Sequence, residues 1–131
     1  MNERQQIKSL LTRLNSSKVK LFPAERQRIA APDTHGVYLI RSPSGRVVHV
    51  GRTVRGHAGL AQRLTNHLRG QSSFTIGYLR GNGDRLRQGY TFQFIVVRKR
   101  RSRALLEHAA TAWHCPAHLG LGVKREALAR S

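Results

Sequence analysis

Length and charge narrow the class of protein. The chain has 131 residues, the usual size of a single domain, and its one cysteine, Cys115, excludes an internal disulfide. Lysine and arginine total 24 against 6 acidic residues, a net charge of +18, and no apolar run is long enough to span a membrane. So many positive side chains repel one another in a compact fold, and a bound polyanion usually balances their charge. The composition therefore predicts a cytoplasmic nucleic-acid-binding protein, although a small ribosomal-type structural protein would be equally basic.

The first half of the chain predicts a helix followed by a β-hairpin. Apolar residues at helical spacing favour an amphipathic helix at 3–15, and the polar break Asn15-Ser16-Ser17 follows it. Strand-like apolar runs at 36–40 and 46–50 flank the turn residues Ser42-Pro43-Ser44-Gly45. The two runs are therefore expected to pair as an antiparallel hairpin.

The second half predicts two longer helices with a strand between them. A helix is expected at 60–69, a short helix near 74–79, a strand at 91–97 and a helix at 103–114 that Pro116 ends. The order β-β-α-β-α predicts an α+β domain with a mainly antiparallel three-stranded sheet flanked by helices. We divide the chain into a basic N-terminal helical arm at 1–34, a folded domain at 35–120 and a basic C-terminal tail at 121–131.

Glu107 is the candidate metal ligand. It is the only carboxylate between Asp84 and Glu126, and it follows five basic residues within 98–103. On a helical wheel it lies at the edge of an apolar stripe formed by Leu105, Leu106, Ala109, Ala110 and Trp113. A single acid at such a rim can bind Mg²⁺ when water fills the other positions. The alternative is a solvated glutamate that relieves local repulsion.

The helix at 60–69 carries a second candidate pair. Arg63 and His67 are four residues apart, so they share one face of the helix beside the stripe of Leu60, Leu64 and Leu68. A half-sheltered arginine and histidine can bind a phosphate and handle a proton. The alternative is two ordinary surface cations.

The hairpin supplies the remaining motifs. Gly36-Val37-Tyr38 opens the first strand, and His49-Val50-Gly51 closes the second, directly before Arg52. With Arg63, His67 and Glu107 following in order, residues 35–120 resemble the GIY-YIG nuclease superfamily. The resemblance implies a metal-dependent endonuclease that hydrolyses phosphodiester bonds, with DNA favoured over RNA and no small-molecule cofactor.

The resemblance also implies roles for these residues. Glu107 is expected to hold Mg²⁺ or Mn²⁺, and Arg63 to bind the scissile phosphate. Tyr38 is the leading general base, with His67 and His49 nearby to relay the proton, and Arg52 and Arg63 are expected to favour the ionised phenol. Gly51 and Arg52 would contact the substrate, and Arg98, Arg100 and Arg101 would grip its backbone.

Two departures from the family pattern leave an alternative open. His49 stands where the second motif has a tyrosine, and no asparagine follows Pro116, where the chain has Leu119 and Gly120. His114 or His118 could substitute for that asparagine. The alternative is a catalytically inactive nucleic-acid-binding module of the same fold.

Other sites are disfavoured. Adjacent His114 and Cys115 lack the spaced pairs of a structural zinc site, and no glycine-rich loop continues into Gly-Lys-Ser/Thr. Phe92 and Phe94 alternate on a strand, which favours a core position over base stacking.

Overall fold

A four-stranded antiparallel sheet forms the centre of the protein. The computed structural model describes residues 1–54 and 59–119. The strands, in spatial order, are β1 (Lys20–Leu21), β4 (Thr91–Val96), β2 (Gly36–Arg41) and β3 (Val47–Arg52). The α+β class is confirmed, but the expectation of three strands was wrong. Strand β1 adds a short edge by pairing with β4, and two residues are too few to show the alternation that identifies a strand.

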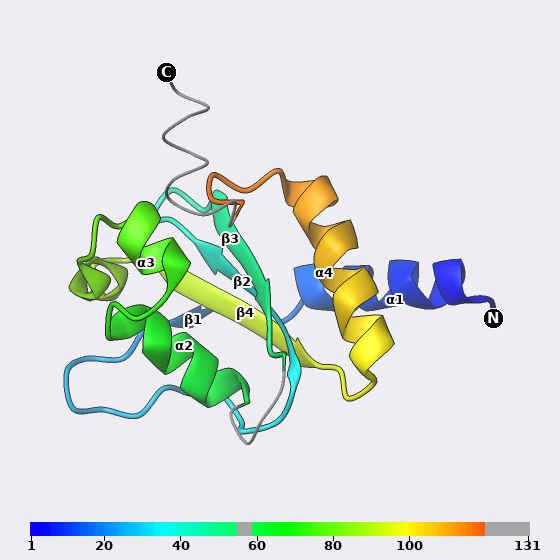
Figure 1. Ribbon diagram of the computed structural model, residues 1–131, viewed down its shortest axis with the longest axis horizontal. Coiled ribbons are helices and arrows are strands. Elements are labelled where there is room, and N and C mark those ends of the chain that lie inside the picture. The colour runs from blue at the N-terminus through cyan, green and yellow to red at the C-terminus, as the bar shows by residue number, and fades with distance from the viewer. Residues whose placement is uncertain (55–58, 120–131) are drawn as a thin grey trace.

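Helices cover both faces of the sheet (Figure 1). Helices α2 (Leu60–Leu68) and α3 (Ser73–Gly77) lie on one face, and α1 (Glu3–Asn15) and α4 (Arg100–His114) lie on the other. A 3₁₀ helix, η1 (Gly83–Arg87), precedes β4. These bounds confirm the predicted helices and strands to within a few residues. No helix among the described residues is both long and apolar enough to cross a membrane.

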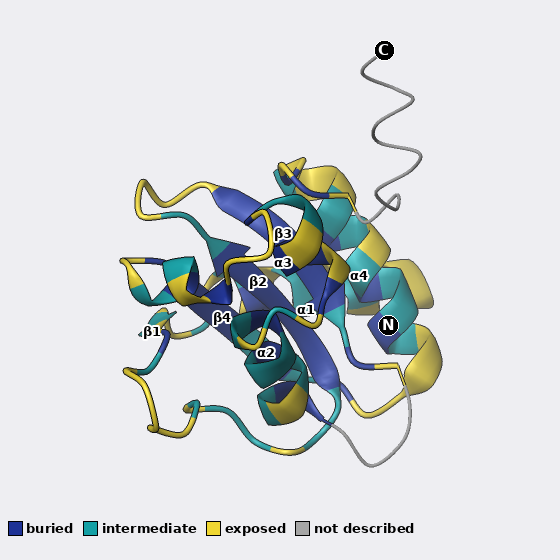
Figure 2. Cartoon of the chain, turned by 60° about the vertical axis from the view of Figure 1, so that its left-hand side comes forward, coloured by how far each residue is buried: buried dark blue, intermediate teal, exposed yellow. Residues whose placement is uncertain are grey.

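The alternation of β2 divides the apolar residues between two cores. Tyr38 and Ile40 point to the core under α2 and α3, whereas Val37 and Leu39 point to the core under α4. Strands β2 and β3 are buried on both faces, while the outer helix surfaces are exposed (Figure 2). Phe92 is fully buried and Phe94 packs against the same core, which confirms the core position of this alternating pair.

Helix α4 buries Leu106 and Ala110 as expected, but not the whole of the expected stripe. Its buried residues are Arg103, Leu106 and Ala110, and Trp113 is 69% exposed, so the prediction that Trp113 belongs to the buried stripe was wrong. Arg103 is the first of the three buried residues of α4. Its Nε donates to Thr53 O, and its Nη1 donates to Val97 O and Arg98 O, at 3.1, 3.1 and 2.8 Å. These bonds fix the start of α4 against the end of β3.

Helix α1 is packed onto the sheet domain. Leu14 is fully buried in the core under α4, and Leu10 and Leu11 pack against that core. The Asn15 side chain lies 2.6 Å from Nε2 of His114, so α1 and α4 are also joined by a polar contact. The division of the chain at residue 34 stays a prediction, but the helix before it shares a core with the residues after it.

Replacing Leu14 with alanine is expected to lower the free energy of unfolding by about 2–5 kcal/mol, because it leaves a cavity in a shared core. The matched control is Leu21→Ala, whose side chain is 69% exposed and whose loss should cost under about 0.5 kcal/mol. Urea unfolding followed by circular dichroism measures both. A parental midpoint for Leu14→Ala would show that α1 contributes nothing to the fold.

Candidate active site

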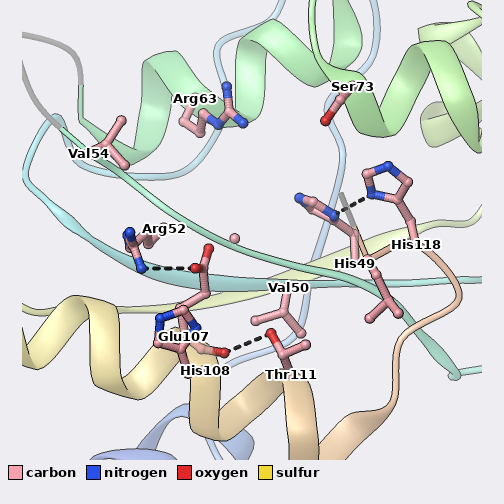
Figure 3. A pocket seen from close by; sticks show the side chains of 12 residues that line it. His49, Val50, Arg52, Val54, Arg63, Ser73, Glu107, His108, Thr111 and His118 are labelled. Carbon is pink, nitrogen blue, oxygen red and sulfur yellow. Dashed lines mark hydrogen bonds and ion pairs between the residues drawn. The ribbon is translucent and has the colours of Figure 1, made fainter. Parts of the chain in front are cut away.

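A cleft of about 400 Å³ lies along the free edge of β3, between α2 and α3 on one side and α4 on the other (Figure 3). β3 pairs with β2 on one side, and its other edge faces the cleft except where His118 bridges to it. The lining residues come from four elements and the segment after α4: His49, Val50, Gly51, Arg52, Val54, Arg63, Ser73, Glu107, His108, Thr111, His118 and Leu119. Five residues predicted for the site therefore line one cavity.

Glu107 and the two arginines set the charge of this cleft. Arg63 extends from α2 and Glu107 from α4, on opposite walls (Figure 3). Arg52 Nη1 donates to Glu107 Oε1 at 3.0 Å, and the two side chains remain about a quarter exposed. Glu107 Oε2 forms no hydrogen bond with a described residue. The carboxylate thus keeps one oxygen for another ligand, and Arg63 has no carboxylate partner among the described residues.

Tyr38 and His67 form a buried pair behind the cleft. The Tyr38 hydroxyl lies 2.6 Å from His67 Nε2, and both side chains are fully buried. His67 was expected to be half-sheltered, and this expectation was wrong because the core under α2 closes over its ring. The two residues therefore act on the cleft from behind its wall rather than from its surface.

A chain of hydrogen bonds assigns the tautomer of His67. Its Nδ1 lies 2.6 Å from Ser72 Oγ, Ser72 Oγ donates to Thr75 Oγ1 at 3.1 Å, and Thr75 Oγ1 donates to the carbonyl of His67 at 2.6 Å. Every donor in this ring has an acceptor when His67 Nδ1 carries the proton. Nε2 is then the acceptor for the hydroxyl proton of Tyr38. Ser72 and Thr75 were missed from the sequence, where their only signal is an N-cap serine ahead of α3.

Burial controls the ionisation of this pair. Desolvation raises the pKa of Tyr38 to about 12. Arg63 lowers this pKa, as expected of a neighbouring cation, but burial outweighs it, so the expected phenolate is not formed. Burial, with the charge of Arg63, lowers the pKa of His67 to about 3. Both groups are neutral at pH 7 in the free protein.

Gly51 brings the Tyr38 hydroxyl up to the cleft wall. The two residues are opposite each other on β3 and β2, and a Cβ built on Gly51 would lie 2.3 Å from the Tyr38 hydroxyl oxygen. Gly51 itself lines the cleft. Only glycine leaves room for the phenol here. Gly36 is equally confined, with its Cβ position 2.2 Å from Ile95 O.

His49 belongs to a cluster of aromatic rings at the inner end of the cleft. Its ring stacks on Phe74 at 4.7 Å between centroids, and its Nδ1 lies 3.2 Å from Nδ1 of His118. His49 Nε2 is buried without a hydrogen-bond partner in the described residues. Burial, followed by the charges of His67, His118 and Arg63, keeps the pKa of His49 well below its usual value. His49 is thus a neutral imidazole in the wall of the cleft.

Of the two histidines offered as substitutes for the family asparagine, only His118 reaches the site. Its backbone N–H donates to Val48 O at 2.9 Å, which places the segment after α4 beside β3. His114 instead contacts Asn15 of α1, away from the cleft. The expected backbone grips also lie outside the cleft: Arg98, Arg100 and Arg101 are exposed around the start of α4, and Arg101 pairs with Glu3 at 2.7 Å.

Comparison with known proteins decides the fold. No family model matches the chain, and no curated protein matches it. The GIY-YIG N-terminal endonuclease domain of UvrC from Thermotoga maritima, bound to its catalytic magnesium, superposes with a TM-score of 0.50 at 19% identity, covering 89% of this chain and 97% of that chain. The chain has the GIY-YIG fold. Structures of two tyrosine-to-phenylalanine mutants of that domain match with the same TM-score and identity and cover 96% of that chain. The GIY-YIG fold predicted from the motifs is therefore confirmed.

The buried histidines are expected to make the protein sensitive to acid. His49 and His67 stay neutral in the fold, whereas in the unfolded chain they bind protons as the pH falls below about 6.5. The unfolded state then binds more protons, so their contribution is intact above about pH 6.5 and is lost as the pH falls towards the folded pKa values, at up to about 1.4 kcal/mol per pH unit for each histidine. Urea unfolding at pH 7.5 and pH 5.0 measures the loss.

The matched control is His108→Gln, which removes an exposed histidine and should keep the same pH dependence. His67→Gln should unfold at a lower urea concentration at pH 7.5 but lose less stability between the two pH values. Equal parental midpoints at pH 7.5 and 5.0 would contradict the neutral state of the buried rings.

Proposed function

We propose that this protein is a metal-dependent endonuclease that hydrolyses phosphodiester bonds, with DNA as the favoured substrate. The observation that carries the proposal is convergence: Arg63, Glu107 and Gly51, from three elements, line one cleft, with the Tyr38 hydroxyl directly behind Gly51. Phosphodiester hydrolysis needs a cation at the phosphate, a ligand for a metal and a group that handles the proton of water. The net charge of +18 supports a polyanionic substrate.

The donor set suits a magnesium ion held by a single carboxylate. No group of three or more His, Cys, Asp or Glu suited to a metal occurs among the described residues, so Glu107 would be the protein ligand, through Oε2. Mg²⁺ commonly keeps several waters and takes one or two carboxylates together with phosphate oxygens. The bound magnesium of the Thermotoga maritima domain, which shares the fold, supports this assignment. When bound, such an ion neutralises charge that develops on the phosphate.

Other side chains supply the remaining catalytic roles in this proposal. Arg63, which has no carboxylate partner among the described residues, binds the scissile phosphate and stabilises its additional charge in the transition state. The Tyr38 hydroxyl, directly behind Gly51, takes a proton from the attacking water as it passes its own proton to Nε2 of His67, which requires the wall at Gly51 to admit that water. His49, neutral and with a free Nε2, is a second proton acceptor at the inner end of the cleft. Arg52 holds the Glu107 carboxylate in place.

A non-catalytic nucleic-acid-binding module is the second candidate, and two observations favour it. Tyr38 and His67 are fully buried in the free protein, and Arg52 already neutralises part of the charge of Glu107. Such a module would bind the same substrates through its basic residues but would cut none of them with any divalent cation. Cleavage assays separate the two candidates directly.

Glu107→Gln is expected to abolish metal-dependent cutting while binding survives, because the basic residues supply the affinity. The assay incubates the protein with labelled single-stranded, double-stranded and flapped DNA and RNA in Mg²⁺, Mn²⁺ or EDTA. The parent should cut at least one substrate only with a metal, and Glu107→Gln should cut it about 100-fold more slowly or worse.

Glu25→Gln is the matched control, since it makes the same change in net charge at an exposed residue with no ion pair among the described residues. It should cut at the parental rate. Undiminished cutting by Glu107→Gln would remove Glu107 as the metal ligand. Binding without cutting by the parent on every substrate and metal would establish the non-catalytic module instead.

A further inference from the structure

A second, smaller cavity adjoins the cleft at the end of β3. It measures about 80 Å³ and is lined by Arg52, Thr53, Val54, Arg100, Arg103 and Ala104, and we call it the arginine cavity. Arg52 and Val54 line both this cavity and the cleft, so the two spaces are direct neighbours. No sequence motif predicts a function for the arginine cavity.

Three guanidinium groups meet there without an acidic residue in the lining. Arg103 is only 5% exposed, and its Nε and Nη1 are held by three backbone carbonyls. Its Nη2 forms no hydrogen bond with a described residue. Arg100 is exposed and has no ion pair among the described residues. One buried arginine held by backbone carbonyls and one exposed arginine therefore line the same small space.

The charges of this cluster repel one another. The pKa of Arg103 is lowered by burial and further by the positive charges of Arg100 and Arg52. The ion pair of Arg52 with Glu107 lies on the cleft side and leaves the other two guanidinium groups uncompensated. Helix α4 also begins here, and its N-terminal potential has the same sign. An anion in the arginine cavity would relieve all of these repulsions.

We propose that the arginine cavity binds a phosphate group, that of the nucleotide next to the scissile phosphate on the substrate strand. The space is too small for a nucleoside but suits a tetrahedral oxyanion, and guanidinium groups match phosphate oxygens in a bidentate geometry. Because Arg52 separates it from Glu107, a strand along the β3 edge would place one phosphate in each space. The identity of the ligand as nucleic acid rests on the proposed function, whereas the phosphate chemistry does not.

The test follows the Nε–H signal of Arg103 by nuclear magnetic resonance during titration with inorganic phosphate and, separately, with a short thymidine oligonucleotide in EDTA. This N–H is buried and donates to Thr53 O, so it exchanges slowly enough to observe. Both probes should shift the signal in the parent. Arg100→Gln should weaken the apparent phosphate affinity about tenfold, equivalent to about 1.4 kcal/mol.

Arg46→Gln makes the same charge change in the exposed turn before β3, at the other end of that strand, and should respond as the parent does. A signal that no probe shifts, or that shifts equally in Arg100→Gln, overturns the cavity as a phosphate site. A shift with inorganic phosphate alone overturns its assignment to the substrate strand. If the parent cuts but the signal is unmoved, this inference fails alone; if the signal shifts but nothing is cut, the proposed endonuclease fails alone.

Discussion

The hydrogen bond between the Tyr38 hydroxyl and His67 Nε2 joins the sheet to α2 behind the cleft. It forms because Gly51, on the neighbouring strand, leaves the space that the phenol occupies. The hydrogen bonds of His67 with Ser72 and Thr75 then orient the imidazole so that Nε2 points to the Tyr38 hydroxyl. A methyl group at position 51 would push the phenol aside and break this arrangement, so the glycine of β3 determines where the phenol lies.

The outer edge of β3 borders the cleft in front of this buried pair. The sheet buries its central strands between two layers of helices, and the last strand on this side presents its open edge to the cleft. Arg63 faces this edge from one layer and Glu107 from the other. Arg63 has no carboxylate partner among the described residues, so its charge in the cleft is available to a phosphate.

Local patterns predicted the fold well, and burial explains where they failed. The spacing of apolar residues predicts the hairpin, α2 and α4, but β1 has only two residues and is too short to show such a pattern. The charges near Tyr38 are visible in the sequence and predict a phenolate, whereas the desolvation that reverses this shift depends on tertiary packing. Arg103 sits in a run of cations, and its spacing from Leu106 and Ala110 was the one signal of its buried position. Ser72 is joined to His67 by tertiary contact that no motif reports.

The most direct measurement of the central claim, that the buried Tyr38–His67 pair serves hydrolysis, is the single-turnover cutting rate of Tyr38→Phe. This variant keeps the ring over Gly51 and removes only the hydroxyl, at a cost of about 1–3 kcal/mol in stability from the unpaired His67 nitrogen. Tyr78→Phe, which removes a hydroxyl from a ring that stacks on Phe74, is the control. We predict that folded Tyr38→Phe binds substrate as the parent does but cuts about 100-fold more slowly, while Tyr78→Phe cuts normally. A parental cutting rate for Tyr38→Phe would contradict the account.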